Sequence, residues 1–222
     1  MLLAVDTSTQ WMGMALLHDD QILSETIWQT RAHHSVELAP AIDQLLRRSA
    51  VQMNDLEVLA VASGPGSFTS LRIGMAVIKG LAMALHLPII GIPTLDIQAA
   101  GVPLQDIQMA AVLKAGRGRL AVGWYQPVAG KWQSMGNPEV LTPEELEQVI
   151  KKPTLVCGEL STEERRTLAR RWKKVVLASP ATSLRRPSYL AELAWQRWQN
   201  HDVDDVVSLA PVYLHYKDAI PG

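Results

Sequence analysis

Two short segments contain the residue types that bind phosphate in proteins. Asp6-Thr7-Ser8-Thr9 follows an apolar run, and a carboxylate beside hydroxyl groups suits a loop that holds a metal and a phosphate. Gly64-Pro65-Gly66-Ser67-Phe68-Thr69 lies between a predicted strand and a predicted helix, where backbone N–H groups and the helix dipole attract anions. The candidate anion-binding residues of this loop are Gly64, Gly66, Ser67 and Thr69.

Both segments also have a plainer structural interpretation, which we favour from the residues alone. The first is typical of an Asx or Ser/Thr turn. The second is typical of a tight turn in which Ser67 or Thr69 caps the following helix. The glycine loop has neither the spacing of a P-loop nor the third glycine of a dinucleotide fingerprint.

Three other features are open to a chemical interpretation. The adjacent pair His33-His34 cannot face one metal from regular structure, so capping or surface positions are expected. The single cysteine, Cys157, is expected to be buried and inert, and the usual zinc spacings are absent. A basic run around Trp172, from Glu163 to Lys174, could touch RNA, although a solvated helix face with its charges ordered along the helix dipole is the favoured interpretation.

Composition narrows the class of protein. The 222 residues are 48% hydrophobic and 19% charged, which indicates one large folded domain or two small lobes. No uninterrupted apolar run reaches the roughly 20 residues of a membrane helix, and the first residues lack the features of a secretory signal. We therefore expect a cytoplasmic protein. The formal net charge of −1 argues against a chain that binds nucleic acid over its whole surface, but it leaves a local basic patch open.

The first part of the chain predicts a mixed α/β sheet. Apolar runs joined by short turns predict an antiparallel meander, and alternating helix and strand patterns then predict parallel crossovers. The strands are expected at 2–5, 12–17, 22–27, 58–62 and 89–92, with helices at 35–50 and 69–87. Pro40 is expected to bend the first helix or to mark its start.

The second part of the chain has a weaker pattern. Strands are expected at 109–113, 120–125, 154–157 and 175–177, and helices at 143–150, 162–172 and 188–198. The segment 114–119 has the glycines and cations of a flexible hairpin. We place a junction near Gly101-Val102-Pro103, which divides the chain into lobes at 1–101 and 102–222.

The helix expected at 69–87 is apolar on two faces. A bulky stripe comprises Leu71, Met75, Ile78, Ala82 and Leu85, and the opposite stripe of mainly small residues comprises Ile73, Ala76, Gly80 and Ala84. Either the helix is enclosed within its own protein, or one stripe covers the sheet while the other meets a partner subunit.

Several of these motifs occur together and in a fixed order. They are Asp6-Thr7-Ser8-Thr9, His34-Ser35 with Leu38 and Pro40, the Gly64 to Thr69 loop with Leu71-Arg72-Ile73-Gly74, Lys79-Gly80-Leu81-Ala82, and Pro88-Ile89-Ile90-Gly91. The set resembles the bacterial TsaB (YeaZ) family over roughly the first 98 residues, and the resemblance returns only at Pro211-Val212-Tyr213-Leu214.

This resemblance implies a fold and a pathway. The family belongs to the actin-like ATPase superfamily (ASKHA, ribonuclease H-like), so two related α/β lobes with mixed sheets are expected, the second one reduced. Its members act in making N6-threonylcarbamoyladenosine at position 37 of tRNAs that read codons beginning with A. The transfer is attributed to the sister protein TsaD, with TsaE as an ATPase partner, and tRNA is reached indirectly through the complex.

The same resemblance implies that this chain is not the catalyst. The sister family holds its metal on two histidines spaced His-x-x-x-His, and these places fall here on Thr94 and Gln98. Neither side chain replaces a neutral imidazole well, so we expect no metal, no cofactor and no catalytic residue.

The family forms its contact with TsaD through helices of the first lobe. The expected interface residues are Leu38, Ile42, Leu45, Leu71, Ile73, Met75, Ala76, Gly80 and Ala84. A homodimer through the same helices is one alternative. A stand-alone actin-fold ATPase or phosphotransferase that uses the Asp6 and Gly64 loops is the other.

Overall fold

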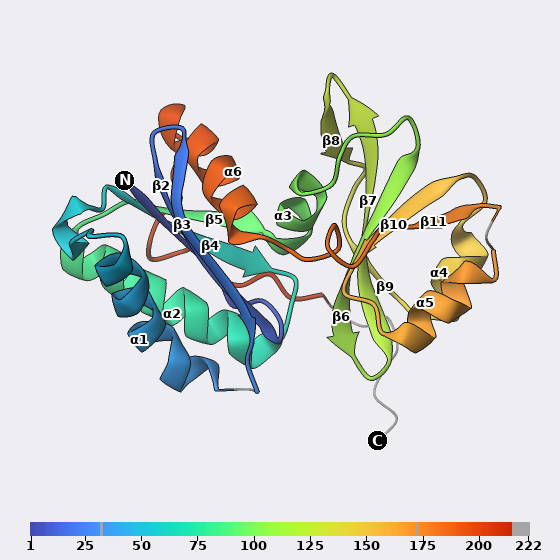
Figure 1. Cartoon of the computed structure of the whole chain (residues 1–222), viewed down its shortest axis with the longest axis horizontal. Coiled ribbons are helices and arrows are strands. Elements are labelled where there is room, and N and C mark those ends of the chain that lie inside the picture. The colour runs from blue at the N-terminus through green and yellow to red at the C-terminus, as the bar shows by residue number, and fades with distance from the viewer. Residues whose placement is uncertain (32, 172, 215–222) are drawn as a thin grey trace. The chain divides into compact units, whose positions relative to one another are not determined.

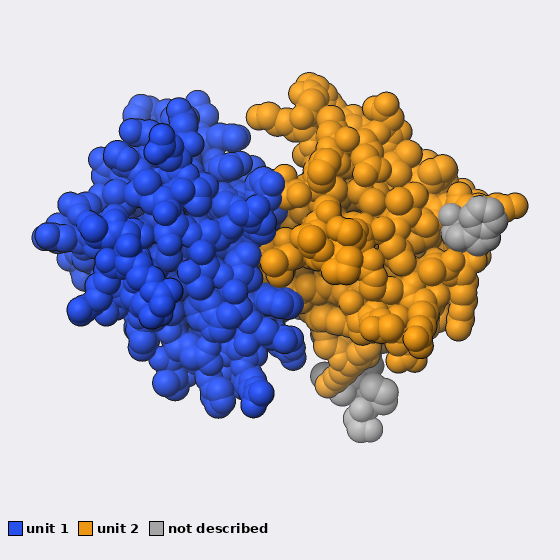
Figure 2. Space-filling view, viewed as in Figure 1, with its two compact units in different colours: residues 1–97, 186–212 blue, residues 98–185, 213–222 orange. Residues whose placement is uncertain are grey.

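The computed structural model describes residues 1–31, 33–171 and 173–214, and it divides them into two compact units. Unit 1 consists of residues 1–97 and 186–212, and unit 2 consists of residues 98–185 with Tyr213 and Leu214 (Figure 2). The structure divides the chain differently from the expected lobes at 1–101 and 102–222. The C-terminal helix returns to unit 1, because its apolar side chains pack on the sheet of that unit.

Unit 1 is a five-stranded mixed sheet with helices on both faces (Figure 1). Its elements are β1 (Leu2–Asp6), β2 (Trp11–His18), β3 (Gln21–Gln29), α1 (His34–Arg48), the 3-10 turn η1 (Met53–Asp55), β4 (Val58–Gly64), α2 (Phe68–Leu85), β5 (Ile89–Pro93) and α6 (Pro187–Gln199). The helix α3 (Thr94–Ala100) begins in this unit. The strand order is β3-β2-β1-β4-β5, with β1, β4 and β5 parallel and the other two pairings antiparallel.

Alternation along the strands assigns side chains to the two faces of this sheet. On β1, Leu3 and Val5 enter a core shared with α1 and α2, whereas Leu2 and Ala4 enter a core shared with α6. All five residues of β1 are buried, as expected of a central strand covered on both sides.

Unit 2 repeats the same strand arrangement with shorter helices. Its elements are β6 (Gln108–Gly116), β7 (Arg119–Val128), β8 (Lys131–Ser134), β9 (Glu139–Leu141), α4 (Pro143–Val149), β10 (Thr154–Gly158), α5 (Thr162–Ala169) and β11 (Val175–Leu177). The order β8-β7-β6-β10-β11 matches β3-β2-β1-β4-β5 strand for strand, with the same parallel and antiparallel pairings. The helix that follows the fourth strand has 8 residues in α5, against 18 in α2. The second unit is therefore a reduced copy of the first.

Most predicted elements are present, and the differences have local reasons. The short or polar β8, β9 and α3 were not predicted, because four residues or fewer, or a single turn or two of helix, give too little periodicity. Pro40 lies inside α1, on its exposed side, and the helix begins at His34 instead. The expected helix 162–172 ends at Ala169, and its last residue lies outside the described part of the chain.

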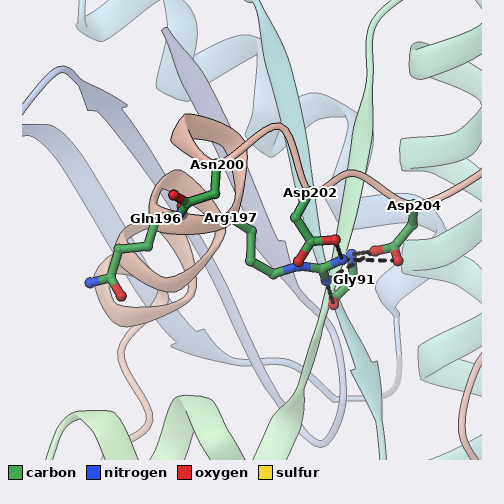
Figure 3. A network of polar contacts seen from close by, with 6 residues as sticks. All are labelled: Gly91, Gln196, Arg197, Asn200, Asp202 and Asp204. Atoms are coloured by element: carbon green, nitrogen blue, oxygen red, sulfur yellow. Dashed lines mark hydrogen bonds and ion pairs between the residues drawn. The ribbon is translucent and has the colours of Figure 1, made fainter.

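An arginine of α6 closes the β5 edge of the unit 1 sheet (Figure 3). The Arg197 guanidinium donates to both carboxylate oxygens of Asp202, at 2.7 and 3.0 Å, and of Asp204, at 3.1 and 3.2 Å. It also donates to the Gly91 carbonyl at 3.0 Å, while Asp204 accepts from the Gly91 N–H at 2.7 Å. The backbone of Asp204 pairs with Ile89. Polar groups of the edge strand thus bond within the unit, which discourages pairing with another chain.

We predict that Arg197→Met lowers the free energy of unfolding by about 2 kcal/mol. The substitution leaves the Gly91 carbonyl without this donor and removes the cation that faces two carboxylates. Urea denaturation measures the change. Arg47→Met is the matched control, because the Arg47–Asp43 pair is exposed and should contribute under about 0.5 kcal/mol. Equal losses in the two variants would contradict the prediction.

A second ion pair fastens the other edge strand to α6. Glu25 on β3 accepts from the Arg186 Nε at 3.0 Å and from the Ser188 N–H at 3.0 Å. Burial raises the pKa of this carboxyl, but the hydrogen bonds from Arg186 and Ser188 together outweigh it, so the pKa lies below its usual value. A lowered pKa means that the ionised form stabilises the fold above the ordinary pKa, and that this stability is lost as the pH falls through the folded-state pKa.

Glu25→Gln should therefore be less stable than the wild type by about 1–2 kcal/mol near pH 7. The difference should shrink as the pH falls below about 4 and the wild-type carboxyl takes up its proton. Chemical denaturation at a series of pH values measures it. A difference that stays constant from pH 7 to pH 3 would show that the charge of Glu25 has no part in it.

Candidate functional site: the outer face of α2 and the loop junction beneath it

Four of the five residues of the bulky stripe of α2 are buried in unit 1, and Leu85 is half-buried. Leu71 and Ile78 have no exposed surface, and Met75 and Ala82 are 4% and 2% exposed. Met75, Ile78 and Ala82 pack in the core that α1 and α2 share with the sheet. This stripe therefore covers the sheet, which is one of the two roles expected from the sequence.

The small-residue stripe of α2 faces outward. Ala76, Gly80 and Ala84 are exposed and Ile73 is half-buried. A Cβ atom added at Gly80 would meet nothing within 4 Å. By length and composition alone α2 is apolar enough to cross a membrane, and only 33% of it is buried in the structure. A helix this apolar, with one face open, presents a surface that favours coverage by another body.

Five of the nine expected interface residues are not on that surface. Leu38, Ile42, Leu45, Leu71 and Met75 are each at most 4% exposed, so a partner cannot contact them. The sequence showed an apolar stripe on each helix but not which surface covers it, and the sheet of the same unit covers these stripes. We remove these five residues from the interface; Ile73, Ala76, Gly80 and Ala84 remain candidates.

Other exposed apolar side chains, which the sequence did not single out, lie on α2 and α1. Phe68 and Met83 of α2 are 53% and 63% exposed, and Val36 of α1 is 71% exposed. The Arg72 guanidinium lies 3.8 Å from the centre of the Phe68 ring, where it screens part of that ring.

Residues 203–212, which we call the C-terminal strap, are fastened beside α2. The Lys79 ammonium donates to the carbonyl oxygens of Val207 and Leu209, both at 3.0 Å. Leu209 packs against the core of α1 and α2, whereas Val207 is 79% exposed. The strap thus adds an exposed valine next to Lys79 of α2. Sequence periodicity could not reveal this neighbour, because residues 79 and 207 are far apart in the chain.

The Gly64 loop is packed directly against the loop that follows β1. The Ser67 N–H donates to the Ser8 carbonyl at 2.7 Å, and a Cβ atom added at Gly66 would lie 2.2 Å from that same oxygen. The Gly64 N–H donates to the Thr94 hydroxyl at 3.1 Å. Two N–H groups that could hold an anion are therefore already used within the protein. Anion binding at Gly64, Gly66, Ser67 and Thr69 stays a prediction.

The hydroxyl-rich segment after β1 connects strand ends and helix starts. Asp6 accepts from the Ser8 N–H at 2.8 Å, which is the Asx turn favoured from the sequence. Thr7 donates to the Ser70 carbonyl in the first turn of α2 at 2.8 Å. His34 is buried and its Nε2 lies 2.9 Å from the Thr9 carbonyl, so this histidine connects α1 to the same loop.

Thr94 and Gln98 are both buried, and only the first has a hydrogen-bonding role. The Thr94 hydroxyl lies 2.8 Å from the Ser8 hydroxyl and accepts from the Gly64 N–H, which joins the ends of β1, β4 and β5. The Gln98 amide is 1% exposed and has no hydrogen-bond partner in the described part of the chain. Among the described residues, no group of three or more His, Cys, Asp or Glu side chains is placed to hold a metal ion.

Two glycine substitutions should change stability in opposite directions. Gly66→Ala should cost at least about 2 kcal/mol of unfolding free energy, because the new Cβ would collide with the Ser8 carbonyl. Gly80→Ala should add about 0.5–1 kcal/mol, because alanine is the better helix former and the site is open. Thermal and urea unfolding of the two variants measure the difference. Losses of similar size in both would refute this account of the two positions.

Comparison with known proteins places these features in one family. A family model described as TsaD, tRNA N6-adenosine threonylcarbamoyltransferase, matches residues 21–219. The tRNA threonylcarbamoyladenosine biosynthesis protein TsaB of Bacillus subtilis (strain 168) is 32% identical over 222 residues, covering 98% of this chain and 95% of the relative. TsaB of Escherichia coli (strain K12) is 32% identical over 146 residues, covering 64% of this chain and 63% of the relative.

Solved structures agree with the fold. YeaZ from Pseudomonas aeruginosa superimposes with a TM-score of 0.79 at 27% identity, covering 96% of this chain and 99% of that one. The ethanolamine utilization protein EutJ from Carboxydothermus hydrogenoformans has a TM-score of 0.52 at 12% identity, which shows the fold alone. The predicted actin-like α/β fold with two related mixed sheets is confirmed. The chain therefore belongs to the TsaB family of tRNA threonylcarbamoyladenosine biosynthesis proteins.

Proposed function

We propose that this chain is a non-catalytic subunit of the complex that makes N6-threonylcarbamoyladenosine at position 37 of tRNAs reading codons that begin with A. Its role is to bind a TsaD-type transferase through the outer face of α2 and to support it. The observation that carries the proposal is the exposed stripe of Ala76, Gly80 and Ala84 on a helix whose opposite stripe is buried.

The shape of this stripe suits a helix of the partner. Small residues four apart lie on one line of the helix and let a second helix approach closely, so that bulky side chains of the partner fit into the shallow groove. Ile73 and Met83 add larger apolar side chains near the line, which would supply contact area. The strap contributes Val207 beside Lys79.

The non-catalytic role is supported by the residues at two positions of this chain. The family resemblance aligns these positions with the metal-binding histidines of the sister family. Thr94 is a poor ligand beside imidazole, and its hydroxyl is engaged with Ser8 and Gly64. The Gln98 amide is likewise a weaker ligand than a neutral imidazole. We place the chemistry of the complex on the partner, and we propose a TsaE-like ATPase as a further subunit.

A stand-alone ATPase or phosphotransferase is the rival function. It would need phosphate groups between the Asp6 and Gly64 loops, where Ser67 and Ser8 are instead hydrogen-bonded to each other. Magnesium-dependent nucleotide turnover by the isolated chain, abolished in Asp6→Ala, would overturn the non-catalytic role.

Gly80→Leu should weaken binding to the TsaD-type partner by at least about 100-fold, because the leucine side chain would fill the line along which the partner helix approaches. Isothermal titration with the purified partner measures affinity, and light scattering on the chain alone shows whether a homodimer uses the same face. The substituted protein should still fold, because the site is open in the free chain.

Ala169→Leu is the matched control, since this exposed alanine ends α5 in unit 2 and should leave the affinity unchanged. Gly80→Leu with wild-type affinity would exclude the outer face of α2 from the interface. Failure of the wild-type chain to bind the partner at tens of micromolar would defeat the proposed function as a whole.

A further inference from the structure

The net charge of the chain is close to zero because its two units carry formal charges of opposite sign. In unit 1, the residues 1–97 and 186–212 include 7 Lys and Arg against 13 Asp and Glu, a formal charge of −6. In unit 2, the residues 98–185 include 13 Lys and Arg against 8 Asp and Glu, a formal charge of +5. At physiological salt the Debye length is about 8 Å, so a polyanion that docks on unit 2 responds to the local charge.

Five of the 13 cations of unit 2 lie just before two neighbouring strands, at the edge of the sheet where both strands begin. Lys151 and Lys152 precede β10, while Arg170, Lys173 and Lys174 precede β11. These two strands are parallel neighbours, with Thr154 paired to Val175, and the Thr154 N–H donates to the Lys174 carbonyl at 2.8 Å. The two runs therefore meet at the same edge, which we call the basic edge (Lys151, Lys152, Arg170, Lys173 and Lys174).

Four of the five cations of the basic edge are exposed, and four of the five have no ion-pair partner among the described residues. Lys151, Lys152, Arg170 and Lys173 are exposed, and Lys174 is half-buried. None of Lys151, Lys152, Arg170 and Lys174 forms an ion pair with another residue that the structure describes.

The carboxylates of unit 2 lie mostly elsewhere. Glu147 is paired with the neighbouring Arg171 at 2.8 Å. Glu144 and Glu145 lie in the first turn of α4, and Glu163 and Glu164 in the first turn of α5, at the ends of those helices remote from the basic edge. One exposed carboxylate, Asp106, lies near the basic edge, two residues before the start of β6.

The helix dipole accounts for only part of this arrangement. Cations stabilise the C-terminal turn of a helix, and the effect falls off within that turn. Arg170 follows α5 directly and gains from this effect, but Lys173 and Lys174 lie beyond it. The basic edge therefore contains more cations than the C-terminal turns of α4 and α5 account for. It belongs to the basic unit of a chain whose other unit is acidic. Such a cluster is suited to bind a polyanion.

We infer that the basic edge of unit 2 binds the phosphate backbone of tRNA directly. This inference rests on the proposed function, which supplies tRNA as the substrate of the complex, and goes beyond it by giving this subunit a contact of its own. Lys and Arg side chains that neutralise phosphates release counterions. The logarithm of the affinity therefore falls linearly with the logarithm of the salt concentration, and the slope is proportional to the number of phosphates neutralised. The contact positions the tRNA and does not read its sequence.

The test is the double substitution Lys151→Gln with Lys152→Gln in the full-length chain. Binding of a fluorescent tRNA is followed by anisotropy between 50 and 200 mM salt, for the chain alone and for its complex with the TsaD-type partner. The dissociation constant should rise about tenfold at low salt, and the slope of log affinity against log salt should become shallower by about 1.5 to 2. Lys151→Arg with Lys152→Arg should restore both values.

Arg117→Glu is the matched control, because Arg117 is exposed in the turn between β6 and β7, beyond the opposite end of β6. It lowers the formal charge of the same unit by two, as the double substitution does, and should change neither the dissociation constant nor the salt slope by as much. Equal effects in the control and the double variant would show that only the net charge of unit 2 matters and would overturn the assignment to the basic edge.

Further outcomes distinguish failure of this inference from failure of the proposed function, and binding of tRNA from binding of a membrane. If the complex forms and modifies tRNA but the double variant binds tRNA with wild-type affinity and slope, the inference fails and the proposed function stands. If the chain does not bind the partner, the proposed function fails, and the titration of the chain alone still decides the inference. Lysine-dependent binding to phosphatidylserine vesicles, without lysine-dependent binding to tRNA, would assign the basic edge to a membrane and overturn it.

Discussion

Burial of one stripe of α2 against the unit 1 sheet is the packing interaction on which the proposed surface depends. Ile78 has no exposed surface, and the same helix places Ala76, Gly80 and Ala84 outward. The rotation of α2 about its axis is therefore determined by its own core, and the orientation of Gly80 follows from it. The opposite face of the same sheet is covered by α6, so both faces of the sheet are packed. Unit 1 can therefore expose the outer apolar face of α2 while its own core stays fully packed.

The strand ends beside α2 are joined to one another by hydrogen bonds between their own polar groups. The Ser8 and Thr94 hydroxyls are hydrogen-bonded to each other, the Gly64 N–H donates to the Thr94 hydroxyl, and the Ser67 N–H donates to the Ser8 carbonyl, across three adjacent strand ends. Buried polar groups must be satisfied, and here other strand ends satisfy them. A further bond, from the Thr7 hydroxyl to the Ser70 carbonyl, connects this junction to the first turn of α2. Stability of the proposed partner-binding helix and closure of the loops are therefore one structural feature.

The two units have the same strand order but have diverged in charge and helix length. Unit 1 retains the long, apolar α2, whereas α5 has 8 residues and its surroundings are rich in cations. The proposed protein-binding face and the proposed RNA-binding edge then belong to separate units. In this arrangement one small subunit would contact both the transferase and its tRNA. The hydrogen bond from Arg197 to the Gly91 carbonyl holds α6 on unit 1, although the chain reaches this helix only after passing through unit 2.

The sequence by itself determined the strands and helices of unit 1, the two stripes of α2 and the family. These depend on local periodicity and on short motifs, such as the run from Gly64 to Thr69, that are legible without long-range contacts. Only the tertiary structure decided which apolar residues are covered, and it moved Leu38 and Met75 from the expected interface into the core. It also decided that α6 belongs to unit 1, that Lys79 fastens the strap, and that Lys152 and Lys174 share an edge. The physical reason is the same in each case: the pairing of strands and the packing of helices bring together residues that are distant along the chain, and no periodicity records those partners.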